Sequence, residues 1–219
     1  MKFVAICLYS TGARALFFSL ALALGGCAAL QPKPRATVYD FGPGPVGTVA
    51  STRMAPLPAL VLADTEASAA LDSNAVLYRL TYSDPQQLRP YTLARWSMTP
   101  AQLLQQRLRA HLGQARPVLN AGLGLAADKP AMVLHLELDE FSQLFETTER
   151  SSGLIRLRAT LGQGGQSVER LLAQRSFIVQ RPAASADAAG GVRALTEASD
   201  AVIAEIAQWL QQVEGAGVQ

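Results

Sequence analysis

Three segments in the second half of the sequence alternate apolar with polar residues, and this alternation constrains the fold more than any other feature. The segments are residues 131–141, 154–161 and 169–180, and the alternation is weaker in the last of them. A period of two is typical of β-strands that bury one face and keep polar residues on the other. The simplest arrangement is an antiparallel meander, with the glycine-rich residues 162–165 as a hairpin turn. Such a sheet needs other elements to cover its apolar face.

Two helices are predicted, and one or both of them cover that face. The first begins at Thr99, whose side chain can cap it, and Pro100 takes the first helical position, where its missing N–H is not needed. Its leucines recur at helical spacing, and Gly113 is the expected stop. After residues 181–191, which read as a flexible connection, the chain ends in a second helix of roughly 20 residues. The predicted fold class is α+β, a mainly antiparallel sheet with one or two helices packed on one face.

Shorter segments in the first half of the sequence also have the character of strands. Residues 59–63 and 75–82 flank a turn-prone stretch and could pair as a hairpin. Residues 116–120 are a candidate short strand, residues 39–41 alternate as a short strand would, and residues 88–96 are mixed.

The first residues of the chain have the pattern of a secretory signal. Lys2 and Arg14 precede an apolar stretch, residues 15–24, which is shorter than the about 20 apolar residues that cross a bilayer. Residues 24–27 read Leu-Gly-Gly-Cys, which resembles the lipobox of bacterial lipoproteins. That resemblance implies cleavage before Cys27 and a covalent diacylglycerol and N-acyl chain on this cysteine.

This interpretation divides the chain into three parts. Residues 1–26 are a lipoprotein signal peptide, residues 27–38 a lipidated tether, and residues 39–214 a single domain. Cys7 lies in the removed part, so a disulfide within the mature chain is excluded, and a single cysteine at the cleavage point fits an anchor. The alternative is an ordinary signal peptide followed by an incidental cysteine.

The charge of the mature chain argues against a nucleic-acid partner. Two of the 19 basic residues lie in the signal, which leaves 17 basic residues against 17 acidic ones and a formal net charge of zero. Proteins that bind nucleic acid normally present a basic patch. No nucleic-acid partner is therefore predicted.

The sequence predicts no catalytic residue and no metal site. It contains no Gly-x-Ser-x-Gly motif, which a serine hydrolase of that class would need. His135, Glu137 and Asp139 share one face of a predicted strand, but successive positions on that face lie about 7 Å apart, which is too far for three ligands of one ion. A polar strand face is the simpler interpretation. The chain is predicted not to be an enzyme and to need no cofactor beyond the lipid on Cys27.

Aromatic and basic residues gather before the first predicted helix. Tyr91 and Trp96 are either core residues or part of a protein interface, where Tyr, Trp and Arg are enriched. Arg79, Arg89 and Arg95 favour the interface.

The order of several short motifs resembles the ABC-type transport auxiliary lipoprotein family. Tyr91, Arg95, Trp96 and Pro100 take the positions of the family's Tyr…Arg-Trp…Pro pattern. Around this block the matching motifs are, in chain order, the lipobox, Tyr39-Asp40-Phe41, the Tyr-Arg segment at 77–80, the strand with two phenylalanines at 134–146, the strand at 157–161 and the helix ending in Trp209-Leu210.

The resemblance implies a lipoprotein on the periplasmic face of the outer membrane. Members work as non-catalytic auxiliary components beside an ABC transporter and its MCE (mammalian cell entry) domain protein, in systems that move lipids between the two membranes. Ala28, where the enterobacterial sorting rule has Asp for retention, favours the outer membrane. Tyr91, Arg95 and Trp96 become candidate contacts with the MCE partner. A lipid-binding shuttle and a regulator of cell-wall synthesis are the alternatives, and homo-oligomer formation stays open.

Overall fold

The structure, a computed structural model, describes residues 34–44, 57–121, 131–164 and 169–216. The chain divides into two units, Met1–Arg35 and Ala36–Gln219, and every element below belongs to the second. The signal peptide and the lipidated cysteine lie outside the described residues. No helix in the described ranges combines the length and the apolar character that crossing a bilayer requires.

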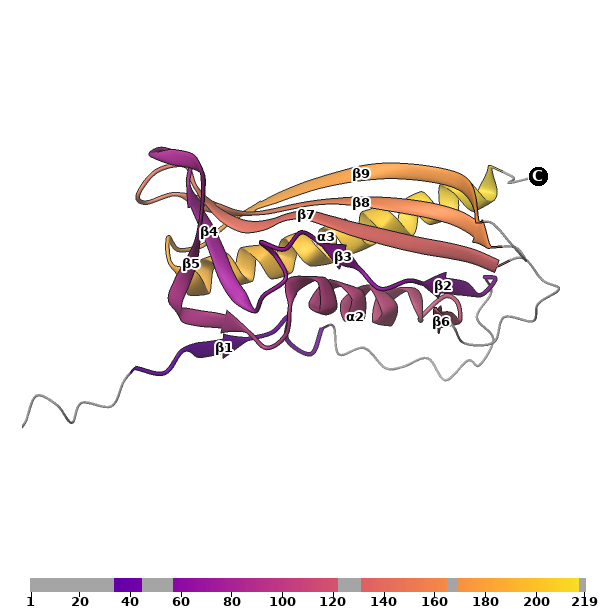
Figure 1. Cartoon of the computed structure of the whole chain (residues 1–219), viewed down its shortest axis with the longest axis horizontal. Helices are drawn as coiled ribbons and strands as arrows, with labels where there is room; N and C mark the ends of the chain where they lie inside the picture. Colours follow the sequence, from indigo (N-terminus) through magenta and orange to yellow (C-terminus); the bar gives the residue numbers. More distant parts are fainter. Residues whose placement is uncertain (1–33, 45–56, 122–130, 165–168, 217–219) are drawn as a thin grey trace, which may run out of the picture. The chain divides into compact units, whose positions relative to one another are not determined.

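Three long strands form the predicted antiparallel meander. They are β7 (Ala131–Phe145), β8 (Ser151–Gly164) and β9 (Arg170–Pro182), and they run side by side in Figure 1. A register shift between Leu138 and Glu140 marks a bulge in β7. The bulge moves the buried set of β7 from even positions before it to odd positions after it. The strands run longer than the alternation predicted, and residues 162–164, expected in a turn, belong to β8.

The other edge of β7 is shared by three short strands that follow one another along the chain. They are β2 (Leu60–Leu62), β3 (Glu66–Ala67) and β4 (Ala75–Leu80), and each pairs with β7 in parallel. The predicted hairpin between 59–63 and 75–82 is therefore wrong. β2 is fully buried between β7 and β6 (Val118–Asn120), and a continuous apolar run of this kind is typical of an interior parallel strand.

Strand β4 instead forms a hairpin with β5 (Asp84–Trp96). The pairing is antiparallel with two register shifts, and β1 (Thr37–Tyr39) joins the outer side of β5 in parallel. Residues 88–96, which the sequence left as mixed, are thus strand. Their pattern is uneven because the first part of β5 is exposed, and buried residues alternate with exposed ones only near its end, at Ala94 and Trp96.

The first helix is confirmed at both ends. α2 (Pro100–Leu112) is capped by Thr99, whose hydroxyl accepts from the Gln102 N–H, while the Gln102 side chain accepts from the Thr99 N–H. This reciprocal capping box satisfies two backbone donors that a helix start leaves without partners. Gly113 is the C-cap, as predicted.

The second helix is longer than predicted and begins earlier. α3 (Ala188–Gly215) has 28 residues, and its N-cap is Asp187, whose carboxylate accepts from the Gly190 N–H at 2.7 Å. The flexible connection predicted at 181–191 is therefore wrong. Its first two residues end β9 and its last four form the first turn of α3. The glycines there mark close packing, because a Cβ at Gly191 would overlap the side chain of Gln143 on β7.

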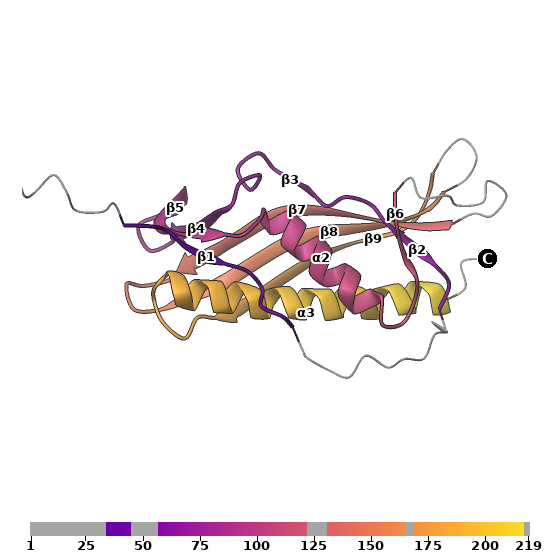
Figure 2. The ribbon, with the colours of Figure 1, turned by 90° about the horizontal axis from the view of Figure 1, so that it is seen from below.

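Both helices lie on the same face of the sheet, as the view from below makes clear (Figure 2). The core fills the space between them and the sheet, with Leu195, Val202 and Ile206 of α3 almost fully buried. The approach is close because the sheet presents Gly153 to the helix, where an added Cβ would lie 2.7 Å from the backbone of Ala194. Two helices on one face of a mainly antiparallel sheet confirm the α+β class.

Candidate docking site

Trp96, a candidate partner contact, is a core residue. Its side chain is 1% exposed, and it packs edge-on against Phe41 and Phe141 with ring centroids 5.7 Å apart in both cases. Its indole N–H has no hydrogen-bond partner among the described residues. The core alternative therefore describes Trp96, and we withdraw it from the candidate contacts.

Tyr91 is half-buried, and its hydroxyl group is already engaged. The hydroxyl donates to Oε1 of Gln143 at 2.9 Å, and Nε2 of Gln143 donates to the Ser151 hydroxyl at 2.7 Å. Gln143 is fully buried on the helix-facing side of β7, directly under Gly191 of α3. The chain of hydrogen bonds therefore ties the β4–β5 hairpin to the meander, and Gln143 packs against the start of α3.

The surroundings of Tyr91 keep its phenol neutral. Burial raises the pKa of the hydroxyl above its ordinary value, and Tyr78 and Asp187 add to the rise. The Tyr78 ring lies against that of Tyr91, with centroids 4.6 Å apart. A neutral phenol can donate its hydrogen bond to the Gln143 carbonyl oxygen across the physiological pH range.

Arg95 is the exposed member of the three candidates. It pairs in register with Val38 of β1, and Leu93 lies two residues away on the same face of β5. Val38 is 64% exposed and Leu93 48% exposed. We call Val38, Leu93 and Arg95 the β1–β5 patch. It is a small apolar surface with one positive charge. Part of it lies on β1, the first strand in chain order.

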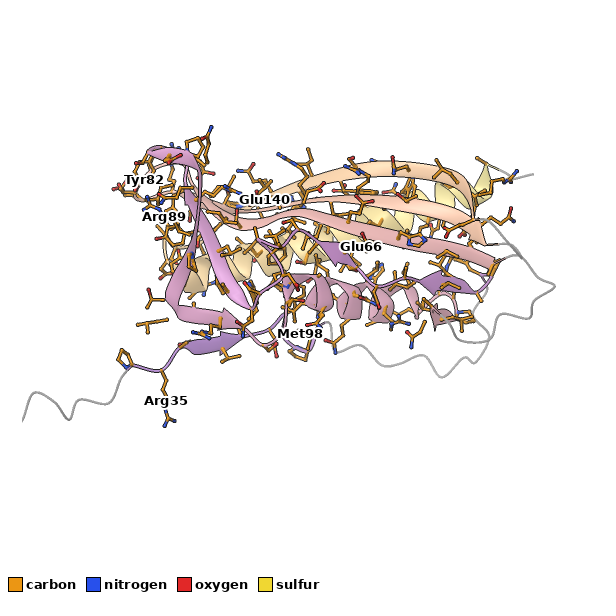
Figure 3. All side chains as sticks on the ribbon, in the orientation of Figure 1. Arg35, Glu66, Tyr82, Arg89, Met98 and Glu140 are labelled. Carbon is orange, nitrogen blue, oxygen red and sulfur yellow. The ribbon has the colours of Figure 1, made fainter. Side chains whose placement is uncertain are left out.

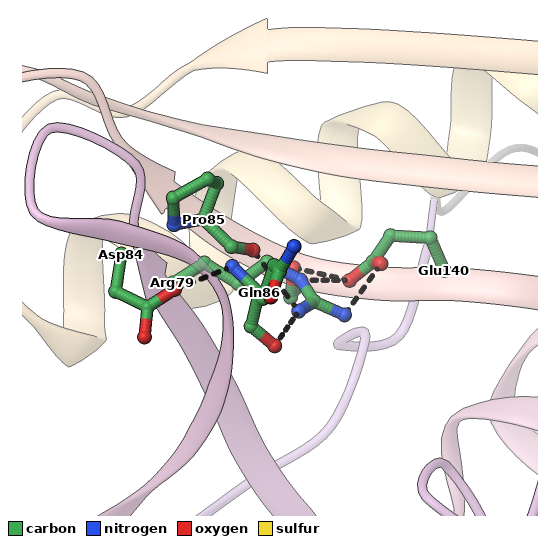
Figure 4. A network of polar contacts seen from close by, with 6 residues as sticks. Arg79, Asp84, Pro85, Gln86 and Glu140 are labelled. Carbon is green, nitrogen blue, oxygen red and sulfur yellow. Dashed lines mark hydrogen bonds and ion pairs between the residues drawn. The ribbon is translucent and has the colours of Figure 1, made fainter.

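A polar network that the sequence did not predict fixes the hairpin near its turn, at the other end of β5 from this patch. The guanidinium of Arg79 makes two hydrogen bonds to the Glu140 carboxylate, at 3.3 and 2.9 Å, and donates to the backbone carbonyls of Pro85 and Gln86 (Figure 4). Glu140 also accepts from the Ser142 hydroxyl at 2.6 Å. Arg79, whose charge had favoured an interface, is thus used inside the structure. Figure 3 shows Tyr82 and Arg89 outside this network, at the end of the hairpin.

The polar face of β7 does not form a metal site. The imidazole of His135 lies 3.0 Å from the Glu169 carboxylate, and Glu137 pairs with Arg158 at 2.9 Å. In the described ranges no three such ligands come together. His135 and Glu137 each have an ion-pair partner on a neighbouring segment.

Two hollows of the described surface carry charged side chains at their walls. One of about 590 Å³ lies between β3 and the start of α2 and is lined by Asp64, Glu66, Asp72 and Gln102, among others. Another of about 370 Å³ lies beside α2 and is lined by Asp40, Gln106 and Arg107 together with Phe41 and Leu103. Carboxylates at the wall disfavour an apolar lipid chain, because their desolvation is costly.

Comparison with known proteins reveals one family. A family model described as "ABC-type transport auxiliary lipoprotein component" matches residues 39–207. No curated protein matches.

Solved structures share the fold at low sequence identity. A Xanthomonas campestris protein assigned to the family model DUF330 aligns with a TM-score of 0.63 at 20% identity, over 84% of this chain and 95% of that one. An uncharacterized protein aligns with a TM-score of 0.57 at 16% identity, over 80% and 99%. A hypothetical protein from Chlamydia trachomatis aligns with a TM-score of 0.51 at 9% identity, over 73% and 99%. These similarities concern the fold alone.

Proposed function

This chain belongs to the family of ABC-type transport auxiliary lipoproteins, and from that membership we propose that it is the outer-membrane-anchored, non-catalytic component of an MCE/ABC-type lipid transport system. The observation that carries the proposal is the family match over residues 39–207, with the Leu-Gly-Gly-Cys lipobox twelve residues before its start. The ATPase of the transporter would supply the energy. This chain would supply attachment and a docking surface on the periplasmic side.

The lipid on Cys27 would limit how far the domain can move from the membrane. Nine peptide units separate Cys27 from Ala36, the first residue of the folded unit, and fully extended they span about 30 Å. Two or three acyl chains bury many methylene groups at about 0.8 kcal/mol each, so the attachment would be durable. A domain held this close to one membrane can fix the outer end of a periplasmic assembly.

The β1–β5 patch is the surface that we propose for docking, with Tyr91 as its support. Leu93 and Arg95 point outward from a strand whose inward residues, Ala94 and Trp96, are fully buried, so the strand is rigidly placed. Exposed aliphatic residues beside an arginine suit a protein partner. The hydrogen bond from Tyr91 to Gln143 holds the same strand against the meander.

The test is co-purification from gently solubilised envelopes with partners identified by mass spectrometry. The full-length lipidated protein should recover an MCE-domain protein, and a Leu93→Asp/Arg95→Glu variant should recover at least tenfold less. Arg193→Glu, an exposed change on α3, is the matched control and should behave as wild type. Recovery of a cell-wall synthase, or of bound lipid without any MCE protein, would instead support one of the two alternative functions.

Replacement of the anchor gives a separate prediction. Cys27→Ser should remove the protein from the outer-membrane fraction, because the residue that carries the acyl chains is lost while the domain is unchanged. Separation of the membranes on a sucrose gradient, followed by immunoblotting, measures this. A Cys27→Ser protein that stays in the outer-membrane fraction would contradict the assignment of the anchor.

A further inference from the structure

Strand β9 has one side without a neighbour. It pairs with β8 from Arg170 to Pro182 with one register shift, and within the described ranges no strand pairs with its other side (Figure 1). An edge strand of this length presents backbone donors and acceptors to which a further strand can add. Natural proteins shorten or cover such edges, or protect them with charged side chains, proline and bulges.

The register identifies which backbone groups face outward. The Ala183 N–H donates to the Ser151 carbonyl at 2.8 Å, so these residues form a hydrogen-bonded pair of the antiparallel ladder. In an antiparallel ladder such residues alternate with residues whose backbone groups point away from the neighbouring strand. Gln174, Ser176 and Ile178 therefore direct their N–H and C=O groups to the open side. Consistent with this, the Gln180 carbonyl accepts from the Arg181 guanidinium at 3.2 Å rather than from β8.

The side chains of this edge form two different rows. On the helix side lie Arg170, Arg175 and Arg181, with the Arg175 guanidinium 4.9 Å from the centre of the buried Phe177 ring. On the opposite, helix-free side lie Leu171 and Ile178, each 62% exposed. One edge therefore offers positive charge on one face and apolar surface on the other.

The charge of this edge is not balanced within the described part of the protein. β9 carries three arginines and no acidic residue, and no described carboxylate lies within 4 Å of the three guanidinium groups. Two arginines elsewhere are used differently, since Arg107 and Arg116 each pair with a carboxylate on α3.

We propose that the open side of β9 binds an extended segment of a partner protein in which acidic residues alternate with apolar ones. Residues of an added strand alternate between the same two faces, so acidic side chains would lie beside Arg175 and Arg181, and apolar ones beside Ile178. The two arginines are six residues apart, about 20 Å along the strand, so one alternating segment reaches both. The inference deepens the proposed function by naming what the partner presents.

A second copy of this chain fits the edge less well. Antiparallel pairing of two β9 strands centred on Ile178 would bring Arg175 of one copy beside Arg181 of the other, and like charges across a strand pair are destabilising. An acidic partner segment turns the same charges into attractive pairs.

The experiment uses the purified, lipidated protein in detergent and a fluorescent nine-residue peptide that alternates valine with glutamate. Two control peptides carry lysine in place of glutamate, or the same residues in two blocks. The alternating acidic peptide should bind at least tenfold more tightly than either control; tenfold corresponds to 1.4 kcal/mol, which is about what two exposed ion pairs supply. Hydrogen exchange should show new protection at the amides of Ser176 and Ile178.

Two variants separate the backbone from the charges. Ser176→Pro removes an outward N–H and leaves the bonds to β8 in place, so it should abolish peptide binding while the thermal unfolding curve stays cooperative. Arg175→Glu/Arg181→Glu leaves the backbone unchanged and should lower affinity for the acidic peptide at least tenfold while raising it for the lysine peptide. Arg89→Glu/Arg193→Glu makes the same change of net charge elsewhere and should leave binding unaltered.

Several results would overturn the proposal. Equal affinity for the lysine peptide would show that the arginines do not select acidic residues. Protection outside β9 would show that the peptide binds elsewhere. Sedimentation that shows a self-associated protein dissociating in Ser176→Pro would identify a second copy as the occupant. Arginine-dependent binding to phosphatidylglycerol vesicles without peptide binding would identify anionic lipid. Because the peptide assay contains no transport protein, its outcome is independent of whether an MCE protein co-purifies.

Discussion

The β4–β5 hairpin and strand β9 both lie at margins of one sheet, but they use their arginines in opposite ways. In the hairpin, Arg79 makes hydrogen bonds to Glu140 and to two backbone carbonyls, all within the structure. In β9, Arg175 lies over a phenylalanine ring with no carboxylate within 4 Å in the described ranges. Arginines that are paired inside fix the position of an element, whereas arginines at an open edge remain accessible to a partner. Substitution of Arg79 should therefore lower stability, and substitution of Arg175 should lower binding at the open edge.

The largest effect should come from the core beneath the hairpin. Trp96→Ala removes a side chain that is 1% exposed and contacts two aromatic rings, so the free energy of unfolding should fall by about 4 kcal/mol. Arg95→Ala, its exposed neighbour, should change it by less than about 0.5 kcal/mol. Urea denaturation followed by tryptophan fluorescence for Arg95→Ala, and by circular dichroism for both variants, measures the difference. Similar losses for the two variants would contradict the assignment of Trp96 to the core.

The ion pair next to the turn of the hairpin should have the next largest effect. Arg79→Met leaves the largely buried Glu140 carboxylate without its partner, and the free energy of unfolding should fall by about 2 kcal/mol. Arg79→Met combined with Glu140→Leu should recover part of the loss, because no charge then remains without a partner. Chemical denaturation of the two single variants and the double variant gives the coupling energy. Additive losses would mean that the pair does not hold the hairpin to β7.

Local signals in the sequence predicted the elements that depend on neighbouring residues. The capping box needs only Thr99 and Gln102, three residues apart, and the meander follows from alternation within each strand. The parallel pairing of β2 with β7 joins residues about seventy positions apart, and no local pattern specifies it. The sequence therefore predicted the α+β class and misplaced the partners of β2 and β4.

The candidate site was predictable to a smaller extent. Tyr91, Arg95 and Trp96 follow one another closely in sequence, but their burial differs because the end of β5 alternates between the core and the surface. The role of Gln143 had a usable signal, since it lies between Phe141 and Phe145 in the alternating pattern and so belongs to the buried face. The Arg79–Glu140 pair had none, because its members come from strands brought together only by the fold.

The hydroxyl of Tyr91 should contribute less than the ion pair. Tyr91→Phe leaves Oε1 of Gln143 without its donor, and the free energy of unfolding should fall by about 1 kcal/mol.

Alkaline pH tests the same contact. The pKa of Tyr91 is raised in the folded state, so its contribution is fully present below the ordinary tyrosine pKa of about 10 and is lost as the pH rises above it, where only the unfolded state releases the proton. The free energy of unfolding, measured from about pH 8 to about pH 11, should depend less on pH for Tyr91→Phe than for wild type. Identical slopes would show that the phenol ionises freely in the folded protein.

The smallest expected effect lies at the junction between β9 and α3. The Asp187 carboxylate accepts from the Gly190 N–H and from the Ser185 hydroxyl, and both bonds lower its pKa. Asp187→Ala should lower the free energy of unfolding by at most about 1 kcal/mol, whereas Asp187→Asn, which can still cap, should be closer to wild type. Because the folded pKa is lowered, the contribution is present above the ordinary aspartate pKa of about 3.9 and is lost as the pH falls below it. The difference between wild type and Asp187→Ala should therefore shrink on acidification, as measured by thermal unfolding. If the stability difference between wild type and Asp187→Ala stays constant with pH, the effect of Asp187 comes from the packing of the start of α3 on Gln143 and Tyr91. The junction would then support the hairpin and would not act as an independent helix cap.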